Sequence, residues 1–260
     1  APMGERADNI VKDLTKAEQL SYLISCIEDF KAASSVDRVV VLWTASTERM
    51  STLSVETSED LLAAIEAGEN EVSPSLLYAT AAVLSGAHFI NGSPQNTLLP
   101  GLVALAQERG VMVAGSDFAS GHTPMKTALM EFFVSRGLRV ASIASYNHLG
   151  NADGRALSNK PQFESKEKSK SGCLLDMVAS NSVLYPKDGS KDPQQCVVIK
   201  YLPRVGDDKR ALDEWVVDAA MGGELTLTTA AVCPDSLLAL PIMLDLILLT
   251  ELFSRVRVGL

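Results

Sequence analysis

Residues 37–49 read DRVVVLWTASTER, and this stretch decides the class of fold. The run Val39–Leu42 within it is wholly apolar and mostly β-branched, which is typical of a parallel strand buried on both faces. Hydroxyl side chains follow at the carboxyl end of this strand, where ligands collect in open α/β sheets. Two interpretations of Thr44 and its neighbours stay open: a ligand site, or an ordinary polar turn.

The same order of strand, polar turn and helix recurs twice more in the first half of the chain. A short strand ending at Asn91 leads through GSPQNT into a helix, and GVMV leads through GSDFASG into a helix ending near Gly137. This repetition indicates a doubly wound or βαβ arrangement. Other helices are predicted over residues 14–33, 58–67, 73–86 and 96–108.

The turn after Asn91 has the composition of a candidate cradle for an anion. Free backbone N–H groups at the start of the helix predicted from Asn96 favour a phosphate, and Ser93, Gln95 and Asn96 add side-chain partners. A plain helix cap is the alternative interpretation.

Polar chemistry concentrates in residues 145–171, SYNHLGNADGRALSNKPQFESKEKSKS, directly after a predicted strand, LRVASIAS. Such a segment is either an exposed loop or an active site. A helix is predicted from the lysines to Ser180. On that helix Lys166 and Lys170, four residues apart, would share one face.

The last third of the chain is predicted to contain a surface loop over residues 182–195 and a strand over 196–203. A helical stretch is expected after Lys209, and residues 224–232 alternate like a strand. Asp235 is expected to cap a long apolar helix that closes the chain.

Composition excludes several classes of function. The 260 residues, 47% of them hydrophobic, are ample for a core in one or two domains. A net charge of -9 argues against broad binding to nucleic acid or to an anionic membrane, so any anion site must be local. The four scattered cysteines suggest neither a metal site nor a disulfide framework, and a cytoplasmic location fits them best.

No targeting or transmembrane segment is expected. The first 13 residues lack the apolar core of a signal peptide. Residues 237–253 are strongly apolar, but Pro241, Asp245 and Glu251 favour a buried or interface helix over a membrane span. The chain also lacks G-x-G-x-x-G, Walker, H-E-x-x-H and G-x-S-x-G motifs.

A series of longer sequence segments closely resembles the eukaryotic type of the myo-inositol-1-phosphate synthase family, from about Arg6 to Val258. The segments are, in order, VVVLWTASTER, NGSPQNT, SDFASGHTPMKT, SYNHLGNADG, SKEKSKS, VVIKY, DKRALDE, MGGELTL and DSLLALPIMLDL. Members of the family are longer. We therefore expect an upstream segment with the glycine-rich dinucleotide fingerprint and a downstream segment with a further active-site lysine.

The resemblance implies an α/β fold with part of an NAD-binding Rossmann-type domain and an α+β catalytic and oligomerisation domain. The expected bounds are residues 1–137 for the Rossmann portion, 138–234 for the catalytic and tetramerisation domain, and 235–260 for a helix returning to the Rossmann domain. A homotetramer is expected, with subunit contacts partly formed by elements after about Leu138.

The implied activity is the NAD-dependent isomerising cyclisation of D-glucose 6-phosphate to 1D-myo-inositol 3-phosphate, also called myo-inositol 1-phosphate. This is the first committed step of inositol, and hence inositol phospholipid, biosynthesis. C5 is oxidised with NAD, the ketone enolises by losing a C6 proton, C6 attacks the C1 aldehyde, and the C5 ketone is reduced again. Two rival interpretations remain: a simple NAD-dependent sugar-phosphate dehydrogenase, and a non-catalytic oligomerisation fragment.

The resemblance also implies the site residues. Lys166 is expected to be the main electrophile or proton-transfer group around C5 and C1, with Lys209 stabilising oxyanions and Lys170 nearer the phosphate. The residues expected to bind substrate are Asn147, Asn151, Asp153, Ser120 and Thr123. The residues expected to bind cofactor are Thr44, Gly92, Ser93, Gln95, Asn96, Asp117, Asp207 and Asp235.

This chain departs from the family's usual residues at several positions. Two family lysines are replaced by Ala119 and Pro124, which puts in question any extra positive charge from that loop. His122 stands for a glutamine and is either a substitute hydrogen-bonding group or an ordinary exposed histidine. Ala152 and Ser46 each stand where the family has asparagine.

Overall fold

The computed structural model describes residue 11 and residues 13–256, apart from the side chains of residues 170–173. Contacts divide the chain into two compact units. Unit 1 is made of residues 1–118 and 243–260, and unit 2 of residues 119–242.

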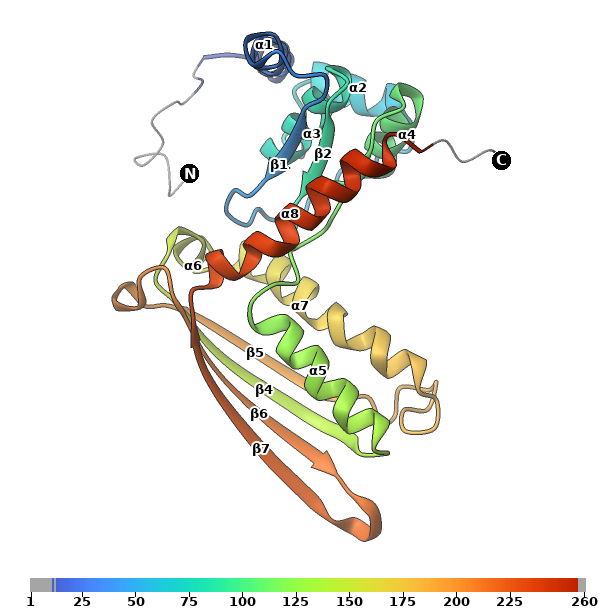
Figure 1. Cartoon of the computed structure of the whole chain (residues 1–260), viewed down its shortest axis with the longest axis vertical. Coiled ribbons are helices and arrows are strands. Elements are labelled where there is room, and N and C mark those ends of the chain that lie inside the picture. The colour runs from blue at the N-terminus through green and yellow to red at the C-terminus, as the bar shows by residue number, and fades with distance from the viewer. Residues whose placement is uncertain (1–10, 12, 257–260) are drawn as a thin grey trace. The chain divides into compact units, whose positions relative to one another are not determined.

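Unit 1 contains a parallel three-stranded sheet (Figure 1). Trp43 pairs with Asn91 and Ile90 pairs with Ala114, so all three strands end at the same edge. The predicted βαβ arrangement is therefore confirmed. In sheet order the strands are β1 (Val40–Trp43), β2 (His88–Asn91) and β3 (Val113–Ala114).

Three helices of unit 1 begin at a side-chain cap. Thr15 and Glu18 form a reciprocal capping box, and the Ser73 side chain accepts a hydrogen bond from the backbone N–H of Leu76. Wholly buried side chains such as Leu61 and Phe89 form the core between helices and sheet. The helices are α1 (Lys16–Ser34), α2 (Ser58–Glu66), α3 (Pro74–Leu84) and α4 (Pro100–Arg109).

The fourth of these helices, α4, begins at Pro100, so the predicted start at Asn96 is wrong. Proline is favoured at the first helical position, and the preceding residues are held in a loop by their side chains. Asn96 accepts a hydrogen bond from the N–H of Ser51 at 2.8 Å and donates to its carbonyl at 2.9 Å. Gln95 accepts from the N–H of Glu48 at 3.2 Å. The predicted cradle residues therefore do not lie at a helix N-terminus.

Unit 2 contains a four-stranded sheet with two longer helices, α5 and α7, packed against it (Figure 1). β4 runs parallel to β5 and antiparallel to β6, which pairs antiparallel with β7. In sheet order the strands are β5 (Gln194–Tyr201), β4 (Arg139–Leu149), β6 (Lys209–Asp218) and β7 (Glu224–Cys233). The helical elements are α5 (His122–Ser135), α6 (Ala152–Ala156), α7 (Lys160–Ser180), η2 (Pro203–Val205) and η3 (Ala220–Gly222).

The stretch 145–171 is the end of a strand followed by two helices, so the interpretation as a single loop is wrong. Residues 145–149 complete β4, and Lys166 and Lys170 lie on α7 as predicted. The end of the strand was not predicted because a polar residue such as Asn147 does not suggest a buried strand position, yet Asn147 is buried.

Residues 209–218 form strand β6, so the helical stretch predicted after Lys209 is wrong. Ala211, Asp213, Trp215 and Val217 are buried and the residues between them are more exposed, which is the period of a strand. The carboxylate of Asp213 at a core position hides this pattern from a hydrophobicity count.

The compact units differ from the expected domain bounds, because unit 2 begins at residue 119 and includes α5. This helix packs on α7 and β4, and its Met130 and Phe133 share a buried cluster with Trp215 and Val217. Unit 2 ends at residue 242, within helix α8 (Asp235–Phe253).

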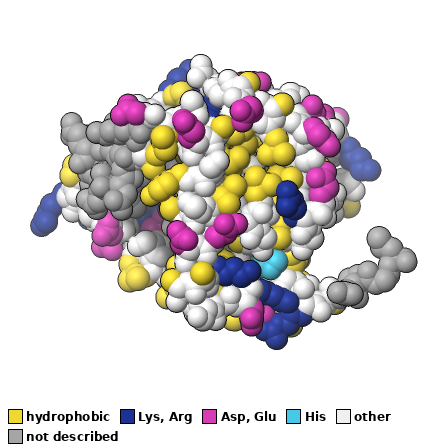
Figure 2. Space-filling view, turned by 90° about the horizontal axis from the view of Figure 1, so that it is seen from above, with side chains coloured by type: hydrophobic (Ala, Val, Ile, Leu, Met, Phe, Trp, Pro, Cys, Tyr) yellow, Lys and Arg dark blue, Asp and Glu magenta, His cyan; other side chains and the backbone are white. Residues whose placement is uncertain are grey.

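Within the described residues, α8 is long and apolar enough to cross a membrane by length and composition alone. Its mean hydropathy is 2.0, and only 11% of the window is buried. The alternative of a core helix of this chain is therefore not supported, and an interface helix stays a prediction. Figure 2 shows hydrophobic side chains gathered near the middle of one face, with acidic side chains around them.

Candidate functional site

Unit 2 gathers three lysine side chains from three elements. Burial lowers the pKa of Lys209, at the start of β6, and the charges of Lys166 on α7 and Lys126 on α5 lower it further. Lys209 and Lys166 were predicted site residues, whereas Lys126 was missed. Lys126 lies in the segment SDFASGHTPMKT, but its local sequence does not relate it to Lys166 and Lys209, because only the fold brings α5 to the other two lysines. We call Lys126, Lys166 and Lys209 the lysine cluster.

Asp235 links the lysine cluster to the N-terminus of α5. A Cβ atom added to Gly121, the N-cap of α5 with φ +61°, would lie 2.5 Å from Asp235 Oδ1. The carboxylate therefore rests against the start of this helix, where partial positive charge favours an anion. Its charge also acts on Lys209, whose pKa it raises against the larger effect of burial.

A buried polar group lies beside the cluster, centred on Asp213. His122 Nε2 is 2.5 Å from Asp213 Oδ2, and the two side chains are 3% and 1% exposed. The prediction of an ordinary exposed histidine at position 122 is therefore wrong. Burial alone would raise the pKa of Asp213, but hydrogen bonds from His122 and Ser145 and the charge of Lys126 lower it to about 2.

Three of the predicted substrate residues lie around the turn that follows β4. Asn147 is buried and donates to the carbonyl of Val198 at 3.3 Å. Asn151 caps α6, accepting from the N–H of Gly154 at 2.8 Å, and Asp153 is half-buried in the first turn of that helix. Asn147 thus bonds to the neighbouring strand β5 and Asn151 shapes the turn, while direct contact of all three with a substrate stays a prediction.

Gly150, in the same turn, has no room for a side chain. A Cβ atom there would lie 2.7 Å from the carbonyl oxygen of Gly206 and 2.8 Å from that of Leu202. We expect Gly150→Ala to destabilise the fold by about 1–3 kcal/mol in urea unfolding, because backbone atoms would have to move. Gly223→Ala is the matched control, since its Cβ would meet nothing closer than 3.4 Å. Equal stability of the two variants would contradict this packing.

The described contacts do not join the remaining predicted residues of unit 2 to the lysine cluster. Ser120 precedes α5, and its carbonyl accepts from the N–H of Thr123 at 3.2 Å. Thr123 is buried, whereas Asp207 is exposed in the turn before β6. Lys170 lies on α7, but its side chain is outside the described residues.

The predicted cofactor residues of unit 1 lie at the carboxyl edge of its parallel sheet. Gly92 donates its N–H to the carbonyl of Trp43 at 2.9 Å, and the Phe118 ring fills the space that a Cβ atom of Gly92 would need. Ser93 donates to the carbonyl of Ala45 at 2.7 Å. Thr44 is exposed after β1, and Asp117 is half-buried after β3. The edge thus places Thr44, Gly92, Ser93 and Asp117 at the ends of neighbouring strands.

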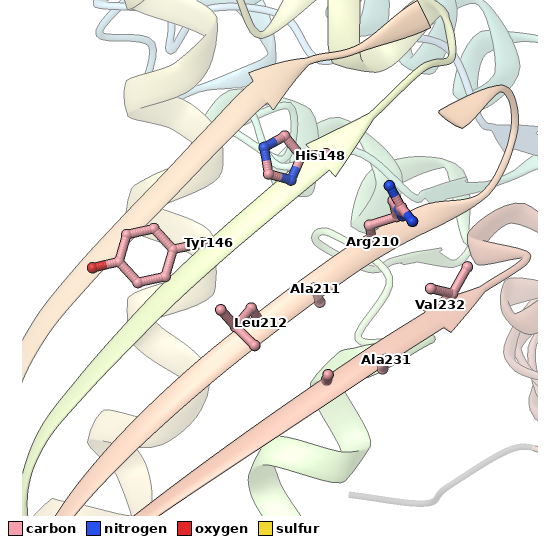
Figure 3. A pocket seen from close by; sticks show the side chains of 8 residues that line it. Tyr146, His148, Arg210, Ala211, Leu212, Ala231 and Val232 are labelled. Carbon is pink, nitrogen blue, oxygen red and sulfur yellow. The ribbon is translucent and has the colours of Figure 1, made fainter. Parts of the chain in front are cut away.

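A shallow hollow lies on the other face of the four-stranded sheet, away from Asp213 (Figure 3). Tyr146 and His148 of β4 line it with Arg210 and Leu212 of β6 and Val232 of β7. These residues alternate along their strands with the buried ones, so the hollow is distinct from the lysine cluster. No group of three His, Cys, Asp or Glu side chains able to hold a metal occurs among the described residues.

Comparison with known proteins gives consistent matches. A family model described as myo-inositol-1-phosphate synthase, of the NAD-binding type, matches residues 1–259. The inositol-3-phosphate synthase of Trypanosoma brucei brucei is 52% identical over 256 residues, which cover 97% of this chain and 48% of that protein. The Drosophila melanogaster enzyme is 50% identical over 260 residues, covering 99% of this chain and 46% of the relative.

Solved structures agree. The crystal structure of inositol-3-phosphate synthase from Caenorhabditis elegans has a TM-score of 0.94 and 48% identity, covering 99% of this chain and 51% of that one. A myo-inositol-1-phosphate synthase-related protein from Thermotoga maritima has a TM-score of 0.77 at 27% identity, covering 96% and 62%. The chain spans about half the length of the curated relatives it matches.

Proposed function

We propose, from the premise that this chain belongs to the myo-inositol-1-phosphate synthase family, that it supplies the lysine cluster for the NAD-dependent conversion of D-glucose 6-phosphate to 1D-myo-inositol 3-phosphate. The observation that supports this most directly is the lysine cluster in unit 2, where Lys166 and Lys126 act on the pKa of a half-buried Lys209. Aldol chemistry on a phosphosugar needs positive charge near developing oxyanions and groups that can exchange protons.

A lysine with a lowered pKa suits both needs. Because burial lowers its pKa, Lys209 is neutral more often at a given pH than an exposed lysine, and a neutral amine can accept a proton from carbon or a hydroxyl. Lys166, carrying charge beside it, would stabilise the enolate oxygen at C5 and the alkoxide formed at C1. Lys170 is proposed to bind the phosphate, as the family pattern implies.

Asp235 has a proposed orienting role. Its carboxylate lies against the N-terminus of α5 and attracts the Lys209 ammonium, which would keep the amine at one place through the proton transfers. The turn at Gly150 and the cap of α6 at Asn151 would hold the sugar's hydroxyl groups nearby.

The residues at the carboxyl edge of the unit 1 sheet fit part of a dinucleotide. Gly92 packs under the Phe118 ring without a side chain, which leaves the hydroxyl of Thr44 and the carboxylate of Asp117 as polar groups at the strand ends. These would hold the sugar or amide groups of NAD, and this sequence has no glycine-rich turn for the pyrophosphate. NAD, when bound, accepts a hydride and returns it.

The proposed activity is tested by incubating the intact protein with glucose 6-phosphate and a substoichiometric amount of NAD. The expected product is inositol phosphate in many-fold excess over NAD, identified by phosphorus NMR, with no accumulation of NADH. NADH formed in proportion to substrate would indicate the simple dehydrogenase instead. A folded intact protein that converts no substrate would leave only the oligomerisation role.

We also propose a homotetramer, with the outer face of the unit 2 sheet as a contact between copies. This face, defined by the residues around the hollow, exposes Tyr146 and Leu212 by 44% each and Val232 by 64%. Large apolar side chains gathered on one sheet face are typical of subunit interfaces.

The free thiols of Cys26, Cys196 and Cys233 support a reducing, cytoplasmic location.

Leu212→Arg is expected to shift the protein from tetramer to smaller species, because a charge would be buried at the contact. Light scattering of the intact protein measures the mass directly. Leu175→Arg is the matched control, since Leu175 is also 44% exposed but lies on α7. A wild type that is monomeric at working concentration would contradict the proposed assembly.

A further inference from the structure

The buried group around Asp213 has one member that reaches toward solvent, Lys126. Its Nζ lies 2.9 Å from Asp213 Oδ1 and donates to Ser145 Oγ at 2.5 Å, and its side chain is 20% exposed. Of the three N–H donors of the ammonium group, one is used by Ser145, while Asp213 Oδ1 holds the charge as an ion pair, so the group can still donate to another acceptor. The amine is thus fixed from one side and accessible from the other.

The carboxylate that holds Lys126 is itself held rigidly. With its pKa lowered to about 2, Asp213 is ionised at neutral pH and can only accept hydrogen bonds, so the proton between it and His122 belongs to Nε2. One oxygen therefore accepts from His122 while the other pairs with Lys126. Ser145 lies directly opposite Asp213 in the register of β4 and β6, so the pairing of the two strands fixes the position of the second group that binds Lys126.

This arrangement is costly as a purely structural device. A buried ion pair gains little over apolar residues of similar size, because both charges lose their hydration. The neighbouring core positions on β6, Ala211 and Trp215, are apolar, so an apolar side chain at 213 would match its surroundings. The carboxylate of Asp213 is therefore best explained by a role in holding the Lys126 ammonium in a fixed position.

Lys126 and Lys209 approach the same face of the sheet. Lys209, Ala211 and Asp213 alternate along β6 and so point to one side, and Asp213 anchors Lys126 on that side. We propose that Lys126, fixed by Asp213 and Ser145, is a positioning residue of the lysine cluster, which acts on the reaction through Lys209. The inference rests on the proposed function only in that Lys209 is taken to be a reacting amine.

The fixed charge of Lys126 repels the protonated form of Lys209 and so keeps more of it neutral. Lys166 acts on Lys209 in the same sense, and Asp235 and Cys233 act in the opposite one. Removal of the charge at 126 should therefore raise the pKa of Lys209.

The test measures how fast Lys209 of the full chain is acetylated at a series of pH values, with the labelled peptide quantified by mass spectrometry. Lys126→Gln removes the charge but keeps an N–H donor for Asp213, and Lys126→Met is a second neutral variant. Both are expected to move the labelling midpoint of Lys209 to a higher pH and to lower its labelling at a fixed pH below that midpoint by about 3- to 10-fold. Lys126→Arg, which keeps the charge, should restore the wild-type midpoint.

Lys200→Met is the matched control, because Lys200 is exposed on β5, paired with His148, whose side chain lines the outer face of the sheet. It should leave the midpoint unchanged. An unmoved midpoint in the folded neutral variants, or an equal shift in Lys200→Met, would overturn the inference. Because labelling needs no turnover, this result is independent of whether the intact protein makes inositol phosphate.

Discussion

Lys166→Ala is expected to lower turnover of glucose 6-phosphate by the intact protein about 1,000-fold or more. Loss of one group that stabilises an oxyanion or transfers a proton typically costs this much. Lys166 is half-buried on α7 and its charge acts on Lys209, so the change removes the amine that we propose to react and also alters its neighbour. Steady-state formation of inositol phosphate measures the effect.

The loss should be confined to catalysis. A lysine side chain contributes little to the core, so urea unfolding and NAD binding of Lys166→Ala should stay close to wild type. Lys168→Ala is the matched control, because Lys168 is exposed two residues further along the same helix, and its turnover should be unchanged. Normal turnover by Lys166→Ala would refute its place in the site.

Trp215→Ala should cost the largest amount of stability among the core changes, about 3–5 kcal/mol in the free energy of unfolding. Trp215 is fully buried on β6, and its ring centre lies 5.9 Å from that of Phe133 on α5. The change would leave a cavity between α5 and β6, which carry Lys126 and Lys209 of the lysine cluster. Urea unfolding followed by far-UV circular dichroism gives the free energy.

Two further variants separate ring packing from other effects. Trp215→Phe keeps an aromatic ring and removes an indole N–H that has no hydrogen-bond partner among the described residues, so its cost should be much smaller. Phe132→Ala, at a side chain that is 52% exposed beside Phe133, should cost less than about 1 kcal/mol. A small loss in Trp215→Ala would show that the core relaxes around the gap.

Much of the architecture of unit 1 was predictable because its signals are local. An apolar β-branched run predicts β1, and Ser73 followed by Pro74 predicts the start of α3, since neighbouring residues decide strand burial and helix capping. Where a local signal was ambiguous, the prediction failed. The residues before Pro100 were read as helix, and only their side-chain bonds to residues 48–51 show that they form a loop.

The sequence by itself determined the α/β class, the membership in a family, and the helix that carries Lys166. Only the tertiary structure decided that residues 209–218 form a strand. Every second residue of this segment is buried against α5 and α7, and this alternation appears only once the helices are packed on the sheet. The tertiary structure also decided that His122 is buried and that Lys126 joins Lys209. His122 is 91 residues from Asp213 in the sequence, and Lys126 is 83 residues from Lys209. Such separations are closed by sheet pairing and helix packing, which no local pattern encodes.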